Sequence, residues 1–443
     1  MDSEIFVKLP PTRLFFRCAV PSMITMAFGA LYQIADGLFV GRFIGGDALA
    51  AVNLVMPIIM IVFGFSNLIA TGASVRIAVL LGESKSEEAS RIFTFTLKVI
   101  FLVSCALGLL GYLLAEPFVR SLAPGATESA IEYAVTYTRV YAAFAPLMLI
   151  SQATDNYLRV CGKEKTSMCL SIGTQLFNII LDVILIALLG QGVWAAAFTS
   201  CFAMSLGAVI TLLMFRGKRL DLYYAKGRIT STAFLQIIFN GSSEFFSSIA
   251  MSVTSIVFNF LLLRHGGTTA VAAFSVIMYV DSIVGMLAFG MADSLQPAIS
   301  YCYGAGMMER VRAIFRRVVL GAVALSAVAL LFMMFAGQYV APLFIKPDDT
   351  ELLAVSITGM KLFSLSYLTG WVDMSLSSYF TALECPVRSL VTSLFGTLVF
   401  PIIALLIFAS LWGLNGVWIS WLFSSAASAV LSTALYLTLK RAG

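Results

Sequence analysis

The stretch LFFRCAVPSMITMAFGALYQIADGLFV, residues 14–40, decides how the rest of the chain is interpreted. It is long and apolar enough to cross a lipid bilayer as a helix, yet Asp36 lies deep within it. A carboxylate in hydrocarbon is costly, so Asp36 is expected to face a water-filled cavity or a cation. Pro21, fifteen residues earlier, removes a backbone hydrogen bond and favours a hinge in this helix. A bendable membrane helix with a buried acid indicates an ion-coupled transporter.

Composition extends this interpretation to the whole chain. The 443 residues are 60% hydrophobic and 12% charged, with a mean hydropathy of +0.95, which excludes a soluble protein of this size. The sequence therefore predicts an all-α integral membrane protein. The first apolar run is too long for a signal-peptide core and lacks a cleavage site, so it is expected to remain in the protein. Twelve runs are long enough to span a bilayer, namely 14–40, 48–71, 92–115, 133–157, 166–189, 193–215, 233–263, 270–302, 313–336, 352–380, 388–411 and 415–439.

The basic residues are distributed unevenly among the loops. With the N-terminus inside and the spans alternating, twenty-two of the twenty-eight Lys and Arg residues fall at or near the inner side. This asymmetry predicts a multi-pass protein of the plasma membrane with both termini in the cytoplasm. The basic runs are interpreted as topology signals, and no nucleic-acid partner is expected. The seven scattered cysteines and the single His265 indicate neither a disulfide framework nor a metal site.

The chain contains an internal repeat. A shift of 222 residues aligns GESKSEEASRIF, residues 82–93, with GAGMMERVRAIF, residues 304–315. After a two-residue insertion, GVWAAAFTS, residues 192–200, aligns with GVWISWLFS, residues 416–424. The repeat predicts two pseudo-symmetric six-helix bundles: an N-lobe (1–215), a cytoplasmic linker (216–232) and a C-lobe (233–443). An even number of spans in each half makes the repeats parallel, and transporters place their sites in or between such repeats.

The first half carries the clearest candidate site. Asn178 and Asp182 are four residues apart in the fifth span, hence on one face of a helix. Together with Asp36 they offer oxygen atoms suited to Na⁺ or to a transferred proton. Thr199 and its neighbour Ser200, in the sixth span, could add a hydroxyl. The structural alternative is ordinary hydrogen bonding between membrane helices.

The second half contains further acids beside aromatic rings, a combination that binds organic cations. For any one ring, packing or interfacial anchoring is the alternative. None of the acids is kept at the equivalent position of the other half, where for example Asp36 aligns with Phe258 and Asp182 with Ala404, which indicates specialised chemistry in each lobe. The candidate substrate or cation residues of the C-lobe are Glu244, Asp281, Asp373, Tyr279, Tyr367 and Trp371.

These features resemble the MATE family, the multidrug and toxic compound extrusion transporters, in its bacterial DinF/MepA-like branch. The resemblance covers nearly the whole chain: the acid-bearing first helix with Pro21, NIILDVILI followed by GVWAAAFT, and QPAISYCYGAG, residues 296–306. In the last motif Ser300 and Cys302 replace the usual Gly and Asn. The resemblance implies V-shaped lobes around a central cavity and a bending role for Pro21. It also implies an N-lobe cation or proton site at Asp36, Asn178, Asp182 and Thr199, and C-lobe acids at Glu244 and Asp373.

The predicted function is antiport: an amphiphilic or cationic organic compound leaves in exchange for entering Na⁺ or H⁺, without a cofactor and without any need for more than a monomer in the bilayer. A flippase or exporter of a lipid-linked or polar metabolite is the first alternative. It would need arginines for a pyrophosphate, whereas the charges within these spans are nearly all acidic. A membrane enzyme would need a catalytic constellation, and HExxH, GxSxG and CxxC motifs are absent from the sequence. A non-transporting receptor or scaffold is the remaining alternative.

Overall fold

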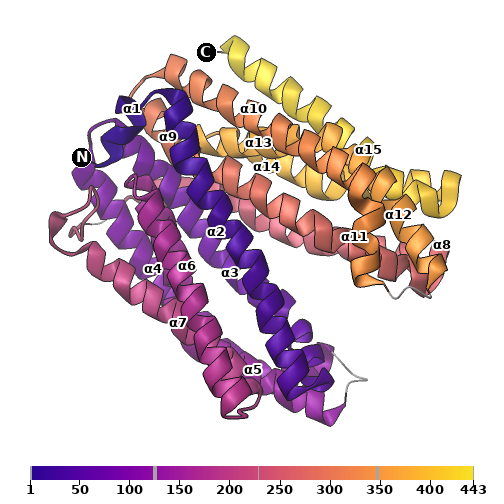
Figure 1. The fold of residues 1–443 in the computed structure, drawn as a ribbon. Helices are drawn as coiled ribbons and strands as arrows, with labels where there is room; N and C mark the ends of the chain where they lie inside the picture. Colours follow the sequence, from indigo (N-terminus) through magenta and orange to yellow (C-terminus); the bar gives the residue numbers. More distant parts are fainter. Residues whose placement is uncertain (1, 123–126, 228, 346–348, 443) are drawn as a thin grey trace. The chain divides into compact units, whose positions relative to one another are not determined.

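The computed structural model describes residues 2–122, 127–227, 229–345 and 349–442, and within these ranges the chain is helical without strands. Among the described residues, nine helices are long and apolar enough to cross a membrane, and two of them contain two spans each. α8 (Ser231–Ser294) is interrupted at Gly267 and α15 (Phe400–Ala442) at Gly413, both at positive φ that glycine adopts without strain. Together with the less apolar α5 (Glu128–Val160), these helices confirm the predicted twelve-span, all-α membrane fold (Figure 1).

The helices form two compact units. Unit 1 contains Met1–Pro10, Ile24–Gly241 and Ser300–Met307. Its helices are the second half of α2 (Pro11–Phe39), α3 (Gly46–Gly82), α4 (Ser86–Leu122), α5, α6 (Glu164–Asp182) and α7 (Val193–Met214), with α9 (Gln296–Gly304) contributing its last turn. An apolar core packs α3, α5 and α7 together around buried residues such as Val55, Tyr137 and Ala196.

The linker segment lies in unit 1 as a non-helical chain. After a short 3-10 turn at Arg216–Lys218, the described residues 219–230 are not helical. The backbone N–H groups of Tyr223 and Ala225 donate to the hydroxyls of Ser90 and Thr94 on α4, at 3.4 and 3.0 Å. Leu222 is fully buried. The segment is therefore packed onto α4 by its backbone.

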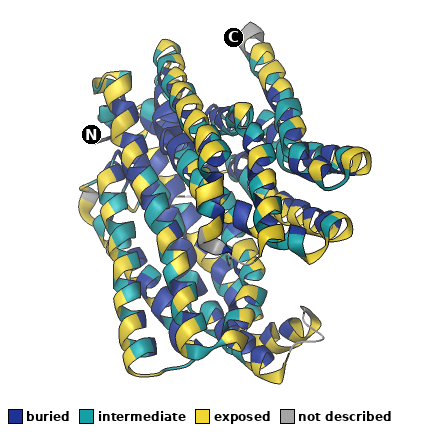
Figure 2. Ribbon diagram, turned by 45° about the vertical axis from the view of Figure 1, so that its right-hand side comes forward, coloured by how far each residue is buried: buried dark blue, intermediate teal, exposed yellow. Residues whose placement is uncertain are grey.

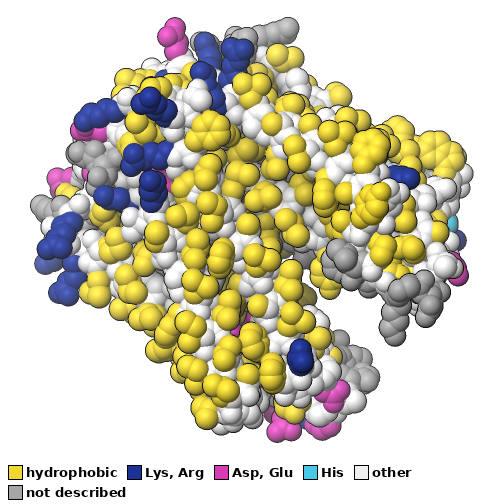
Figure 3. Space-filling view, viewed as in Figure 1, with side chains coloured by type: hydrophobic (Ala, Val, Ile, Leu, Met, Phe, Trp, Pro, Cys, Tyr) yellow, Lys and Arg dark blue, Asp and Glu magenta, His cyan; other side chains and the backbone are white. Residues whose placement is uncertain are grey.

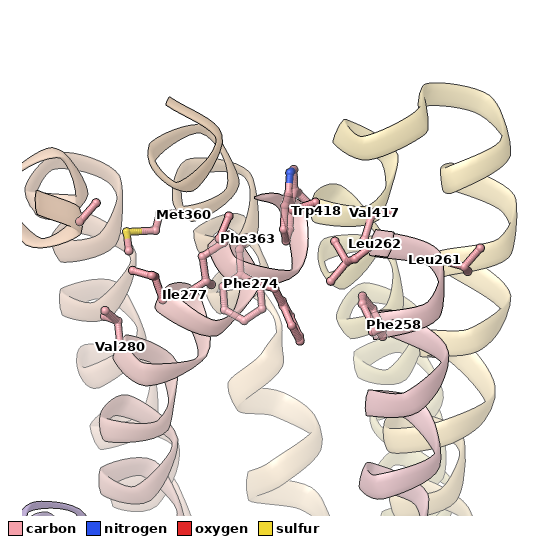
Figure 4. Packing of buried hydrophobic residues seen from close by; sticks show 14 of the residues in the cluster. Phe258, Leu261, Leu262, Phe274, Ile277, Val280, Met360, Phe363, Val417 and Trp418 are labelled. Atoms are coloured by element: carbon pink, nitrogen blue, oxygen red, sulfur yellow. The ribbon is translucent and has the colours of Figure 1, made fainter. Parts of the chain in front are cut away.

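Unit 2 contains Pro11–Met23, Ser242–Ile299 and Met308–Gly443. Its helices include most of α8, α10 (Met308–Leu331), α11 (Gly337–Phe344), α12 (Thr350–Ser364), α13 (Gly370–Ala382), α14 (Pro386–Leu394) and α15. Figure 4 shows its core, where Phe258, Phe274 and Trp418 follow one another with ring centroids 6.0 and 6.3 Å apart. These rings are among the largest buried side chains of the unit, so they account for much of its packing.

The two units share the chain differently from the predicted lobes. The packing places the linker and residues 300–307 with unit 1, and the first turns of α2 with unit 2. The boundaries 1–215, 216–232 and 233–443 stay a prediction. Figure 2 shows exposed residues along one side of most helices. Figure 3, which has the view of Figure 1, shows a surface of the helices that is mainly hydrophobic, as expected for helices that face lipid. Within unit 1, Figure 3 also shows Lys and Arg gathered near the N-terminus, although the orientation in the membrane stays a prediction.

Four short π-helical segments interrupt the α-helices: Val40–Ile44, Val183–Leu188, Phe332–Ala336 and Phe395–Val399. The first begins four residues after Asp36, and the second directly follows Asp182. A π turn accommodates one extra residue, and such turns are frequently found at functional sites. Both candidate acids of unit 1 therefore lie next to an irregular turn.

Candidate functional site

The two acids of the first half lie together inside unit 1. Asp36, on α2, is 8% exposed, and Asp182, the last residue of α6, is fully buried. The two carboxyl groups are close enough to interact electrostatically. Neither forms an ion pair among the described residues, where the ion pairs of unit 1 involve other carboxylates. The pair is thus an acidic site without an ion-pair partner among the described residues.

Hydroxyl and amide groups from α2, α6 and α7 surround these acids. The hydroxyl of Thr199 donates to Asp182 Oδ1 at 2.5 Å. Asn178 Nδ2 donates to Ser200 Oγ at 3.2 Å, and the same hydroxyl lies 2.9 Å from the Tyr32 hydroxyl. The structure therefore brings Asp182, Asn178, Thr199 and Ser200 into the arrangement expected from the spacing, and it brings Asp36 to them.

Three buried oxygen atoms of this site lack a hydrogen-bond partner within the described part of the chain. They are Asp36 Oδ1, Asn178 Oδ1 and Asp182 Oδ2, and each is almost fully shielded from solvent. A buried acceptor that is left unpaired costs about 1–3 kcal/mol, and more when it is charged. Two carboxylate oxygens and an amide oxygen are hard ligands that suit a small cation, and a carboxylate oxygen also accepts a proton.

The site does not have the donors of a tightly held metal centre. Within the described ranges, no group of three or more His, Cys, Asp or Glu side chains could hold a metal ion.

Tyrosines of this site were missed from the sequence. Tyr32 lies one helical turn before Asp36, and Tyr137 and Tyr141 stack on α5 with ring centroids 4.8 Å apart. Tyr137 is also near enough to Asp36 to interact electrostatically with it. The four-residue spacing of Tyr32 and Asp36, and of Tyr137 and Tyr141, was the available signal, because such pairs share a helix face.

In unit 2 the structure separates the candidate residues into local pairs. The Tyr367 hydroxyl donates to Asp281 Oδ1 at 2.5 Å, and Ser432 Oγ donates to Asp373 Oδ1 at 2.8 Å. Glu244 lies within electrostatic range of Asp293. No hydrogen bond among the described residues joins these three pairs into one site.

The remaining aromatic candidates are more exposed. The Tyr279 side chain is 57% exposed, and Trp371 Nε1 donates to the backbone carbonyl of Leu368 at 3.1 Å. Another acid of unit 1, Asp155, forms an ion pair with Arg159, with Oδ2 2.8 Å from Nη2.

Comparison with known proteins identifies the family. The model of the MatE family matches residues 21–184 and again residues 244–407, which also reproduces the internal repeat. The multidrug export protein MepA of Staphylococcus aureus (strain MSSA476) is 24% identical over 423 residues, covering 93% of this chain and 90% of MepA. MepA of Staphylococcus haemolyticus is also 24% identical, over 432 residues, covering 95% and 92%.

Solved structures have the same fold. A MATE crystal structure in complex with MaL6 superposes with a TM-score of 0.90 at 24% identity, covering 100% of both chains. An outward-facing multidrug resistance MATE transporter of the MOP superfamily gives 0.89 at 24% identity, covering 98% of each chain. A MOP superfamily transporter from Pyrococcus furiosus, described as having a binding pocket of reversed polarity, gives 0.90 at 24% identity, covering 98% and 97%.

Proposed function

The chain belongs to the MatE family, and on that premise we propose that it is a secondary active antiporter that exports amphiphilic, often cationic, organic compounds in exchange for Na⁺ or H⁺. The relatives named as multidrug export proteins support the export of drugs. The observation that carries the ion coupling is the group of three unpaired, buried oxygen atoms at Asp36, Asn178 and Asp182.

In the proposed cycle the incoming ion satisfies these oxygens. Binding moves the protein only if one conformation holds the ion more tightly than the other. Asp36 can provide this difference because it lies on α2, the helix that contains Pro21 and ends in a π turn. Bending of α2 at Pro21 would change the distance from Asp36 to Asp182, and with it the affinity for the ion. When more positive charge enters than leaves, each net charge also gains about 2.3 kcal/mol per 100 mV of membrane potential.

The coupling ion can be identified in liposomes that contain the purified protein. Export of ethidium, a fluorescent organic cation, should proceed under an imposed Na⁺ gradient, an imposed pH gradient, or both, and should stop when both gradients are collapsed. Ethidium movement at the same rate without any ion gradient would contradict the antiport proposal. Transport of a polar lipid-linked compound in place of organic cations would favour the flippase.

Thr199 should set the affinity of the site without being needed for turnover. In Thr199→Val the shape is kept, but Asp182 loses the hydroxyl that donates to it at 2.5 Å. A hydrogen bond to a charged group contributes about 1.5–3 kcal/mol, and 1.4 kcal/mol corresponds to a factor of ten. Because this hydrogen bond stabilises the charged, ion-free carboxylate, its loss should make Asp182 hold the ion more tightly. The driving-ion concentration for half-maximal export should therefore fall roughly tenfold or more, measured as the initial rate of ethidium export against ion concentration.

Thr211→Val is the matched control for this prediction. Thr211 is also buried on α7, but its hydroxyl donates to the backbone carbonyl of Gly207 and not to an acid. Its ion dependence should equal that of the unmodified protein. An unchanged ion dependence in Thr199→Val would remove Thr199 from the site.

A further inference from the structure

A short segment of its own precedes α2. A 3-10 turn (Asp2–Glu4) leads into α1 (Ile5–Lys8), and both lie in unit 1. Leu9 and Pro10 are then extended, with ψ of 142° and 141°, because each precedes a proline, and a following proline disfavours the helical conformation. α2 begins at Pro11. The segment is therefore separated from the first membrane helix by a stiff joint and packs independently of it.

The segment is attached to two other parts of unit 1. The backbone N–H of Ser3 donates to Asp221 Oδ2 in the linker at 2.7 Å. The Phe6 ring meets the Tyr301 ring of α9 in an edge arrangement, with centroids 5.7 Å apart, and the Phe6 carbonyl accepts a hydrogen bond from Cys302 Sγ at 3.6 Å. Ser3, Phe6 and Cys302 are fully buried. Figure 1 shows α1 next to α9, and these contacts join the two.

The linker end of this attachment is itself fixed to α4. The Ser86 hydroxyl donates to the backbone carbonyl of Asp221 at 3.4 Å. Tyr223 and Ala225, a few residues later, donate their backbone N–H groups to hydroxyls of the same helix. The segment thus connects a linker that is held on α4 to the end of α9.

The α9 end of the attachment lies at a close backbone contact with α3. A Cβ on Gly82 would lie 2.1 Å from the carbonyl oxygen of Tyr301, so Tyr301 has its carbonyl against α3 and its ring against Phe6. In the sequence, α3 belongs to the first repeat and α9 to the second. The repeats of a transporter move against each other during alternating access. Because this contact is on the predicted cytoplasmic side, it has to separate when the transporter opens to the cytoplasm.

We propose that residues 3–6 are a latch that holds α9 against α3 in this conformation and leaves α9 each time the transporter opens to the cytoplasm. Phe6 supplies the main holding contact, since its ring is fully buried against α9. Ser3 anchors the latch to the linker. The inference rests on the proposed transport cycle, but it requires neither a particular ion nor a particular substrate.

The alternative is that residues 3–6 only add stability to the folded protein. The two roles differ in what they affect. A structural contact changes how much folded protein is present, whereas a latch changes the fraction of folded protein that is open to the cytoplasm. A substrate that binds from the cytoplasm has an apparent affinity in proportion to that fraction. Release of a latch therefore lowers the substrate concentration for half-maximal export.

Phe6→Ala tests this difference in liposomes, as the initial rate of export against the ethidium concentration on the cytoplasmic side. The concentration for half-maximal export should fall roughly threefold or more. Phe6→Leu, which keeps most of the apolar volume, should stay close to the unmodified protein. Phe101→Ala is the matched control, because Phe101 on α4 is 45% exposed and its loss should leave the ethidium dependence unchanged.

The separation of α3 from α9 can also be measured without transport. Val79 on α3 is 3% exposed, and its carbonyl oxygen lies against Gly304 of α9. In a protein whose native cysteines are replaced by Ala, Val79→Cys should react slowly with a membrane-impermeant maleimide added on the cytoplasmic side. Adding Phe6→Ala should raise the labelling rate roughly threefold or more. Adding Phe101→Ala should not change it.

An unchanged labelling rate of Val79→Cys in the Phe6→Ala protein would overturn the latch. So would ethidium export by Phe6→Ala with an unchanged half-maximal concentration. If Phe6→Ala does not fold, Asp221→Ala removes the acceptor of Ser3 and makes the same two tests, with Asp221→Asn, which keeps an acceptor oxygen, as its control. A lack of any ethidium export by the unmodified protein would contradict the proposed antiport, and the labelling would still decide on the latch.

Discussion

Asp36→Asn is expected to reduce ion-driven export to the background of empty liposomes. Asn has nearly the shape of Asp but carries no charge and accepts no proton. The site would keep Asp182 as its sole acid, with the Asn178 oxygen still unpaired. An ion that binds such a site weakly, or equally in both conformations, cannot drive transport. The measurement is the initial rate of ethidium export under saturating Na⁺ and pH gradients.

The control for Asp36→Asn is Asp47→Asn. Asp47 is an exposed acid in the first turn of α3, where it accepts hydrogen bonds from Thr127 and Ser129. Its substitution should leave export intact. Equal amounts of the three proteins in the membrane, and equal elution in detergent, would show that folding is retained. Full ion-driven export by Asp36→Asn would contradict the coupling role assigned to this acid.

Gly304→Ala is expected to have the second large effect, because Gly304 on α9 lies in a close backbone contact with α3 inside unit 1. Gly82 on α3 makes the equivalent contact with α9. A Cβ on Gly304 would lie 2.1 Å from the carbonyl oxygen of Val79, and a Cβ on Gly82 would lie 2.1 Å from that of Tyr301. The four residues are related by the internal shift of 222. Such contacts cannot exist, so either substitution must push the ends of α3 and α9 apart. Overpacking of this kind typically costs about 1–3 kcal/mol.

The expected result is a melting temperature several degrees lower and export reduced at least tenfold for Gly304→Ala, with a similar result for Gly82→Ala. The double variant should be little worse than either single one, since residues that share one contact are not additive. Gly173→Ala on α6 is the control, because a Cβ there meets nothing within 4 Å. Additive losses in the double variant would show that the two glycines act independently.

The sequence predicted the twelve spans well because a bilayer imposes long apolar helices, a requirement that hydropathy reports directly. It also placed Asn178 and Asp182 on one face, because side chains four residues apart in an α-helix point to the same side. Tyr32 was missed because its role depends on Ser200 of another helix. The sharing of α2 between the units was not visible either, because hydropathy records order along the chain and not packing. The amino-acid composition does not predict the π turns beside the acids.

Those π turns have a mechanical consequence. Each residue of an α-helix adds about 100° of rotation, and a π turn stores one surplus residue. If the π turn at Val40–Ile44 shifted along α2 to a position before Asp36, the Asp36 side chain would rotate about the helix axis by roughly 100°. The length of the helix would change by no more than about 1.5 Å. The same holds for Asp182 and Val183–Leu188. A shift of the adjacent π turn could thus change the direction of the Asp36 and Asp182 carboxylates without unwinding either helix.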